Sequence, residues 1–565
     1  MRNFITALLI LFLLVHIAKS QNNTNPFCIN GALPEHAELG FGSFRYHVNW
    51  LFFDSAGTYN FAASDIIANI HGNSGIEPII IFKCTSMIPD TSVYADTIGW
   101  MPCEKELWER IHDPNLPSAE TSWFPADTNA WKSFLTAFVE RYNMDGIDDY
   151  ANLVYPFRIY QLEVEMTRVW CENGPDTFPQ DYVNYLNMSY RTIKQADSNA
   201  IVKMAGWGSV DRHLFYLNYI EADSFPFNQN FHITHYHLDT SLMYQKALAN
   251  WLYIFENADY DVLDIHCYGF AEHFPARAKG LRELFDPLAT KPLWALEGGG
   301  PYRHFAEVFN PENGTGFLSP ELVEENAAYV VRYYTGGIGS GFSRLAWHVV
   351  PEYDPWGQAF GDLDLLSIDY EKKPSYWTYK GMAGFFPDFI NASPIPDGDY
   401  WNNPDITAYS IQTPSADFTI IWNLKDTAGI FLKGLSKQHI FPTIMGDSLW
   451  TQIPLNPDST YFFQTNRIPL IFEGTPEATG YLQHYLYPKI YIYPNPANDL
   501  LYIDSHTHLA GNKTITLLNM CGAEIVKTET AENTSIIDIS SFEKGIYLVR
   551  YIDNNQTIMK KIIKL

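Results

Sequence analysis

Two glutamates, Glu165 and Glu297, each stand at the end of a short apolar, β-rich run. Glu165 closes the run that begins at Arg158. Glu297 closes the run that begins at Lys291 and leads into Gly298-Gly299-Gly300, where backbone can approach a bound molecule closely. Two carboxyl groups can share one hydrolysis, because one protonates the leaving oxygen while the other attacks carbon or activates water. The two glutamates therefore predict the carboxylate pair that cleaves a glycosidic bond.

Other hydrolytic chemistries have less support. His232, His235 and His237 are the only histidine cluster that could serve a metallohydrolase, but a strand would turn His232 away from the other two. Neither Ser209 nor Ser340 has the flanking glycines of a nucleophile elbow. The six cysteines are scattered without a C-x-x-C pair, so we expect no metal and no cofactor.

The segments that must position the two glutamates alternate in type up to about residue 386. Short apolar runs alternate with longer amphipathic stretches, and this order predicts an α/β fold with a parallel sheet, closed economically as a (β/α)8 TIM barrel. An open doubly wound sheet is the alternative, but no glycine-rich phosphate loop follows any strand. The expected strands are Phe41–Val48, Pro78–Lys83, Arg158–Val164, Ile201–Gly206, Val262–Tyr268, Pro292–Glu297 and Arg344–Val349. The expected helices include Asn129–Tyr142, Gln180–Ala196 and Leu322–Tyr334.

One barrel strand is missing from these runs, and we expect it at the start, near Ala32–Leu39. Glu165 then ends the fourth strand and Glu297 the seventh. The C-terminal ends of the strands form the catalytic face of such a barrel, so both carboxylates are predicted to lie on that face.

Composition divides the chain into four segments. Residues 1–20 combine a basic start, an apolar run and small residues up to Ser20, which is typical of a cleaved secretory signal. Residues 21–386 are the expected barrel. Residues 387–487 are β-rich and punctuated by Pro, Gly and Asn, which predicts a small β-sandwich. The last segment, 488–565, again alternates strand-like runs, and we expect a second, sandwich-like β-domain.

The net charge is −27, and loss of Arg2 and Lys19 with the signal would make it −29. A surface this acidic repels phosphate backbones, so we expect no nucleic-acid partner. No segment after the signal approaches transmembrane length, which predicts no stable membrane insertion.

Residues 491–565 carry a distinctive set of motifs. Tyr493-Pro494-Asn495-Pro496 opens the block, Gly545-Ile546-Tyr547 marks a turn and strand, and a Lys-rich end runs from Lys560 to Leu565. In combination they resemble the C-terminal sorting domain of the type IX secretion system of Bacteroidetes. The resemblance implies that the secretion machinery is a partner and that the protein is exported through the periplasm, to be secreted or held at the cell surface. A structural β-domain without such an address is the alternative.

The barrel region carries an ordered series of motifs. They are Phe44-Arg45-Tyr46-His47-Val48-Asn49-Trp50, Gly57-Thr58-Tyr59-Asn60-Phe61 with Asp65, Gly75-Ile76-Glu77-Pro78-Ile79, the stretch from Trp131 to Tyr142, Asp264-Ile265-His266-Cys267-Tyr268 and Trp347. In this order they resemble clan A glycoside hydrolases, notably those like family 39, over about residues 40–380.

The resemblance implies a retaining glycoside hydrolase acting on an extracellular poly- or oligosaccharide. Glu165 would be the acid/base and Glu297 the nucleophile, with their carboxyl groups about 5 Å apart. His266 and Tyr268 would bind substrate beside the nucleophile, Tyr268 as a hydrogen-bond donor to it.

The resemblance also implies roles for Arg45 and Trp347. Arg45 would help to keep Glu297 charged, and Trp347 would form the floor of the sugar subsite. Structural alternatives stay open for both, namely a plain ion pair for Arg45 and core packing for Trp347. For His266 the alternative is a core histidine whose hydrogen bonds are satisfied within the protein.

One position departs from the family pattern. Where the family has Asn before the acid/base glutamate, to bond the sugar 2-hydroxyl, this chain has Val164. An unusual sugar is one explanation, and a barrel that binds glycans without cutting them, as a secreted adhesin-like protein, is the other. Glu163 is expected to share a strand face with Glu165, because strand side chains repeat every second residue.

Overall fold

The structure is a computed structural model with two compact units, Met1–Tyr481 and Leu482–Leu565. The residues that it describes are 25–29, 34–50, 54–55, 58–83, 125, 127–165, 178–208, 214, 242–268, 271–286, 288–299, 320–348, 365–366, 372–395, 406–423, 428–433, 437–440, 449–451, 461–465, 467–474, 477–482, 490–493, 497–505, 513–519, 524–532, 534–553 and 556–564. The signal expected at 1–20 and the histidine cluster at 232–237 lie outside these residues, so both stay predictions.

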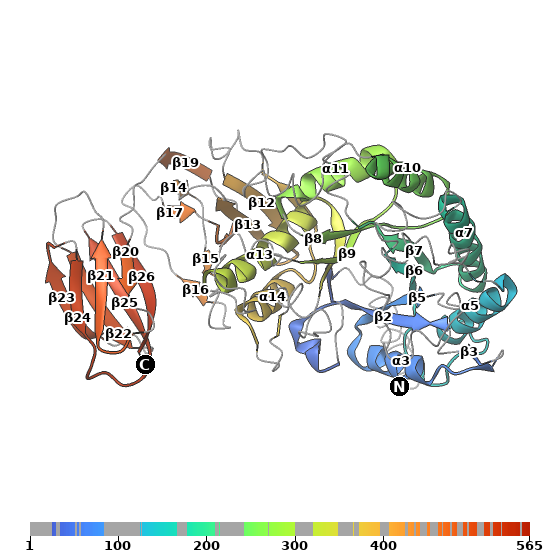
Figure 1. Cartoon of the computed structure of the whole chain (residues 1–565), viewed down its shortest axis with the longest axis horizontal. Coiled ribbons are helices and arrows are strands. Elements are labelled where there is room, and N and C mark those ends of the chain that lie inside the picture. The colour runs from blue at the N-terminus through green and yellow to red at the C-terminus, as the bar shows by residue number, and fades with distance from the viewer. Residues whose placement is uncertain are drawn as a thin grey trace, which may run out of the picture. The chain divides into compact units, whose positions relative to one another are not determined.

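Eight parallel strands form the largest sheet of the first unit. They are β1 (Phe27–Ile29), β2 (Ser43–Asn49), β5 (Glu77–Lys83), β6 (Ile159–Glu165), β7 (Ile201–Gly206), β8 (Leu263–Tyr268), β9 (Leu293–Gly299) and β10 (Phe342–Trp347). Their spatial order, β7-β6-β5-β2-β1-β10-β9-β8, follows the chain. Trp207, just after β7, bridges Ile265 in β8. The bridge joins the two outermost strands, so the sheet curls into the expected barrel (Figure 1).

The first strand, β1, pairs with β2 on one side and β10 on the other. We expected this strand near Ala32–Leu39, and that placement was wrong, because Pro34–Leu39 forms a 3-10 helix. The three residues of β1 are too few to show a strand's alternation in sequence. With β1 in place, Glu165 ends the fourth strand and Glu297 lies at the end of the seventh, as predicted. The other seven strands are all present near their expected bounds.

Helices alternate with the barrel strands and cover the outside of the sheet (Figure 1). They are α3 (Ala62–Ser74), α5 (Thr128–Tyr142), α7 (Phe178–Ala196), α10 (Leu242–Asn257), α11 (Phe274–Phe285), α13 (Pro320–Gly339) and α14 (Pro374–Phe385). The α5 helix starts where the Asp127 carboxylate accepts hydrogen bonds from two backbone N–H groups, those of residues 129 and 130. Its buried Trp131 donates to the Ser189 hydroxyl at 2.9 Å and so ties α5 to α7.

Three motif residues lock α3 onto α5. The Arg141 guanidinium donates two hydrogen bonds to the Asp65 carboxylate, at 2.9 and 2.8 Å, and the Tyr142 hydroxyl donates to the same carboxylate at 2.7 Å. A two-pronged pair of this kind fixes both distance and angle between its elements. The motif residues Asp65 and Arg141 therefore have a structural role, because they hold two helices together.

After α14 the described chain contains strands and no further helix. One antiparallel sheet has the order β11-β12-β13-β18-β15-β16 and another has β17-β14-β19. The strands are β11 (Asn391–Pro394), β12 (Ile406–Gln412), β13 (Asp417–Asn423), β14 (Ala428–Lys433), β15 (Lys437–Ile440), β16 (Leu449–Thr451), β17 (Tyr461–Thr465), β18 (Leu470–Glu473) and β19 (Glu477–Leu482). Glu325 on α13 pairs with Arg467, just before β18, at 2.8 Å and also with Arg332. This cluster attaches the β-rich region to the barrel.

The second unit is a β-structure with its own core. Its two sheets are β20-β21-β24 and β23-β22-β25-β26. The strands are β20 (Ile490–Tyr493), β21 (Leu500–Ser505), β22 (Lys513–Asn519), β23 (Glu524–Thr530), β24 (Thr534–Asp538), β25 (Gly545–Asp553) and β26 (Gln556–Lys564). Buried residues of both sheets, such as Leu501, Ile515 and Val549, share one hydrophobic cluster. None of the described helices is long and apolar enough to cross a membrane.

Candidate active site

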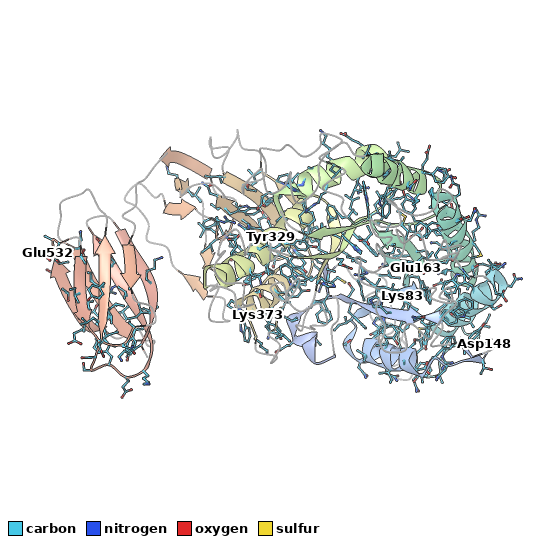
Figure 2. The ribbon with its side chains drawn as sticks, in the orientation of Figure 1. Lys83, Asp148, Glu163, Tyr329, Lys373 and Glu532 are labelled. Carbon is cyan, nitrogen blue, oxygen red and sulfur yellow. The ribbon has the colours of Figure 1, made fainter. Side chains whose placement is uncertain are left out.

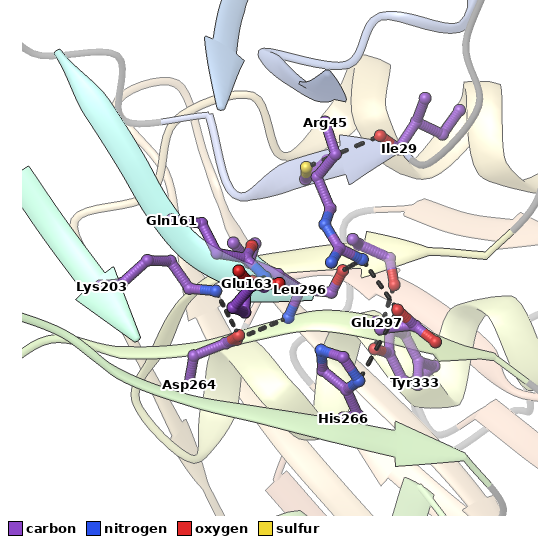
Figure 3. Close-up of polar contacts among 12 residues, drawn as sticks. Ile29, Arg45, Gln161, Glu163, Lys203, Asp264, His266, Leu296, Glu297 and Tyr333 are labelled. Carbon is purple, nitrogen blue, oxygen red and sulfur yellow. Dashed lines mark hydrogen bonds and ion pairs between the residues drawn. The ribbon is translucent and has the colours of Figure 1, made fainter. Parts of the chain in front are cut away.

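Glu297 lies near the C-terminal end of β9, with its side chain 15% exposed. Arg45 reaches it from β2 (Figure 3). One guanidinium nitrogen, Nη1, donates to Oε2 of Glu297 at 2.9 Å and to the carbonyl oxygen of Leu296 at 3.0 Å. The Arg45 side chain is almost fully buried, and pairing in such a low-dielectric setting favours the ionised form of a carboxylate. Arg45 therefore contacts both the predicted nucleophile and the peptide group before it.

His266 lies on β8 beside Glu297 in the strand register. Its Nδ1 is 3.6 Å from Oε2 of Glu297, and the ring is buried. The ring occupies space that Gly206 leaves open on β7, because a Cβ at this glycine would lie 2.1 Å from ring atoms Cδ2 and Nε2. The structure thus brings Arg45, His266 and Glu297 together, and Gly206 makes room for the histidine.

The two glycines after Glu297 are required for different reasons, Gly298 by close packing and Gly299 by its backbone conformation. A Cβ at Gly298 would lie 2.3 Å from the Tyr333 hydroxyl and 2.4 Å from the carbonyl oxygen of Cys267. Gly299 has a φ of +155°, a conformation that favours glycine. The glycine run predicted that a ligand could approach this backbone closely. In the described part of the structure, the atoms that come close to Gly298 are protein atoms of Tyr333 and Cys267.

The strand of the second predicted carboxylate, β6, contains a bulge. Between paired positions, Glu163 and Val164 together face the single residue Ala205 of β7. Glu163 has a φ of +68°, and the Gln161 side-chain amide donates to its carbonyl oxygen at 2.7 Å. The bulge interrupts the alternation on which the expected shared face of Glu163 and Glu165 depended. The backbone of Glu165 ends β6, while its side chain lies outside the described residues, so the expected carboxyl separation stays a prediction.

Trp347 and Tyr268 complete the set of predicted site residues. Trp347 is fully buried at the end of β10, with its ring 5.7 Å from that of Tyr333 and 6.1 Å from that of Tyr329. These contacts are core packing, and stacking on a sugar stays a prediction. The Tyr268 side chain lies outside the described residues, although its backbone pairs with Gly299 in β9.

Further ionisable groups lie at the same end of the barrel. Lys83 ends β5 and Glu163 lies near the end of the adjacent β6 (Figure 2). Burial lowers the pKa of Lys83, while the negative charges of Glu163 and Glu297 oppose this effect. Burial also lowers the pKa of His348 to about 4, again against the charge of Glu297. A lysine and a histidine therefore lie within electrostatic reach of carboxylates where the strands end.

Sequence reasoning missed a buried ion pair below this site. Lys203 on β7 and Asp264 on β8 are both fully buried, and Nζ lies 2.6 Å from Oδ2. The signal was present, since Lys203 interrupts the otherwise apolar strand Ile201–Gly206 and Asp264 stands between Leu263 and Ile265 in the strand Leu263–Tyr268. A charge at such a position requires a partner inside the barrel, but sequence alone does not say which one.

No group of three or more His, Cys, Asp or Glu residues in the described part of the chain is arranged to hold a metal ion. Cys28 and Cys267 are buried, and neither forms a disulfide in the described part of the chain. The remaining four cysteines lie outside the described residues.

Residues 491–565 match the family model for the secretion system C-terminal sorting domain. The match confirms the resemblance that the tail motifs indicated. A comparison with curated proteins gives no match.

Several solved structures are similar over most of the chain at low sequence identity. A family 39 glycoside hydrolase from the gut symbiont Bacteroides cellulosilyticus WH2 is 14% identical with a TM-score of 0.49, covering 81% of this chain and 82% of the other. A family 39 β-xylosidase from Caulobacter crescentus is 12% identical with a TM-score of 0.45, covering 80% and 96%. A glucosidase from Croceicoccus marinus is 12% identical with a TM-score of 0.43, covering 91% and 93%.

Proposed function

We propose that this protein is an exported retaining glycoside hydrolase that acts on an extracellular poly- or oligosaccharide, with Glu297 as nucleophile and Glu165 as acid/base. The observation that carries the proposal is the placement of Glu297. Its carboxylate lies at the C-terminal end of the seventh strand of a barrel, held by Arg45 and beside His266. The backbone of Glu165 ends the fourth strand at the same face, where the active sites of such barrels lie.

The proposed reaction has two steps. In the first, a Glu297 carboxylate oxygen bonds to the anomeric carbon while the bond to the leaving oxygen breaks, and Glu165 gives that oxygen its proton. In the second, Glu165 takes a proton from water, the water oxygen bonds to the same carbon, and Glu297 is released. Arg45 supports this role because it favours the ionised form that can attack.

The match of the tail to a sorting domain supports export by the type IX route, with the secretion machinery as a partner. A carbohydrate outside the cell would then be the substrate. Detection of the protein at the cell surface or in the medium, and its retention inside the cell after deletion of 491–565, tests this part.

The enzymatic part is tested by Glu297→Ala. We expect wild-type protein to cleave at least one member of a panel of aryl glycosides and plant or algal polysaccharides. The variant should lose more than about a thousandfold in kcat, because its nucleophile is gone, yet keep its affinity for the sugar. Glu256→Ala, at an exposed glutamate of α10, is the matched control and should keep full activity.

A second candidate is a barrel that binds glycans without cutting them. Val164 favours it, because this side chain cannot form the 2-hydroxyl hydrogen bond that a retaining enzyme strengthens in its transition state. Wild-type protein that retains a glycan in pull-down assays but cleaves nothing in the panel would support this candidate and refute the proposed one.

A further inference from the structure

The ion pair of Lys203 and Asp264 is unusual for its depth. Both side chains have an exposure of 0%, and their charged atoms are 2.6 Å apart inside the barrel. Removing two ions from water costs several kcal/mol each, and such a pair often stabilises a fold no better than apolar residues would. A contribution to stability therefore explains the pair poorly. The other contacts of Asp264 suggest a different role.

The second oxygen of Asp264 has a specific partner. Oδ1 accepts a hydrogen bond from the backbone N–H of Leu296, at 2.9 Å, in the residue directly before Glu297 (Figure 3). The ladder between β8 and β9 is irregular at this point, because Ala295 and Leu296 together face the single residue Ile265. A bulge of this kind leaves one residue out of the ladder, and the Asp264 carboxylate supplies an acceptor for its N–H.

Leu296, the residue before Glu297, is consequently held through its backbone on both sides. Asp264 accepts from the N–H of Leu296, while Arg45 donates to the carbonyl oxygen of the same residue and to the Glu297 carboxylate. Arg45, Asp264 and Leu296 are all buried, so none of them can exchange these contacts for contacts with solvent.

We propose that Lys203 and Asp264 form a positioning pair for Glu297, in which the Asp264 carboxylate holds the bulged backbone before Glu297 and Lys203 holds that carboxylate in place. Asp264 acts through the backbone, so it is a positioning residue and touches no substrate. The inference rests on the proposed function for its catalytic consequence, whereas the backbone contact stands without it.

The surroundings of Lys203 agree with a fixed charge pair. Burial lowers its pKa to about 8, Asp264 opposes that effect, and the positive charge of Arg45 adds to it. Gln161 is its neighbour in the register of β6 and β7, and the charge of Cys28 also raises the pKa of Lys203. Among the groups that affect the pKa of Lys203, Asp264 is therefore the carboxylate that compensates its positive charge.

Two double variants separate positioning from simple stability. Lys203→Met/Asp264→Asn removes both charges but keeps a side-chain oxygen that can accept from the Leu296 N–H. Lys203→Met/Asp264→Leu removes both charges and also the acceptor, with a side chain of similar size. The pair therefore differs chiefly in the one hydrogen bond under test.

Two readouts are measured on full-length protein whose folding is checked by thermal denaturation. The first is kcat and KM on the glycoside that wild-type protein cleaves. The second is hydrogen exchange of the peptide covering 293–299, which reports local opening without any substrate. Should the leucine variant not fold, Lys203→Met/Asp264→Ala replaces it, since it lacks the same acceptor.

The proposal expects the leucine variant to have a kcat roughly tenfold or more below that of the asparagine variant, with KM within about threefold, because misplacement by a fraction of an ångström slows the chemistry more than it weakens binding. It also expects faster exchange of 293–299 in the leucine variant alone. Equal kcat and equal exchange in the two variants would overturn it. If wild-type protein cleaves no glycoside, the proposed function fails, and the exchange result alone then supports or overturns the positioning role.

Discussion

Gly206→Ala adds a single methyl group where the structure has no room for one. Gly206 ends β7, directly beside His266 on β8. No unusual φ is involved, so the backbone itself can accept alanine. The effect of the substitution comes from the contact between the new methyl group and the histidine ring.

The size of the effect follows from the distances. The added Cβ would lie 2.1 Å from two atoms of the His266 ring and 2.9 Å from Oδ2 of Asp264, while ordinary contact starts at 3.4 Å. The ring must therefore retreat by about 1.3 Å or the strands must separate. Overpacking of this kind costs about 1–3 kcal/mol of unfolding free energy. A shift of about 1 Å beside a nucleophile can cost about a hundredfold in kcat.

The assay combines thermal or denaturant unfolding with kcat and KM on the cleaved glycoside. We expect the kcat of Gly206→Ala to be about a hundredfold lower than that of the wild type. The midpoint of its unfolding transition should also be lower, but the variant should remain folded under assay conditions. Gly384→Ala is the matched control, because a Cβ at this helical glycine meets nothing within 4 Å. The control should keep its activity, and its unfolding free energy should rise by up to about 1 kcal/mol, because alanine stabilises a helix interior relative to glycine.

A double variant tests the cause. His266→Ala removes the ring, so adding Gly206→Ala to it should cost much less than the same change costs in the wild type, and the two effects should not add. The reasoning is refuted if Gly206→Ala has wild-type stability and kcat, or if its cost is unchanged when the ring of His266 is absent.

Three other predictions concern the same end of the barrel. Gly298→Ala should cost about 3 kcal/mol or more in unfolding free energy, measured by denaturant titration, because its Cβ would lie 2.3 Å from the Tyr333 hydroxyl; a loss under about 1 kcal/mol would contradict this. Arg45→Met should lower stability by about 3–5 kcal/mol through the unpaired Glu297 carboxylate, and Arg45→Met/Glu297→Gln should recover part of that loss, which a double-variant unfolding cycle measures. The lowered pKa of His348 means that the unfolded chain binds a proton that the folded chain does not, so unfolding free energy should fall as pH drops from about 6.5 toward about 4; His348→Asn should flatten this slope in pH-dependent unfolding, and an unchanged slope would contradict it.

Much of the fold was accessible from sequence because its signals are local. The runs that became β6 and β9 are short and rich in apolar residues, so their type and order could be predicted without knowledge of their neighbours. Counting strands then placed Glu165 and Glu297 at the ends of the fourth and seventh strands. The strand β1 escaped detection because its three residues carry no periodicity, and its pairing with β2 and β10 depends on the closed ring.

Within the site, the sequence by itself determined that Glu165 and Glu297 stand at strand ends, and the family resemblance added Arg45 and His266 as candidates to lie beside Glu297. Only the tertiary structure decided the contacts among them. The bulges before Glu165 and Glu297, and the union of Lys203 with Asp264, arise from the register between strands far apart in the chain. A residue's own neighbours in sequence carry no information about that register, because it is set by the closure of the barrel and by which side chains can share its interior.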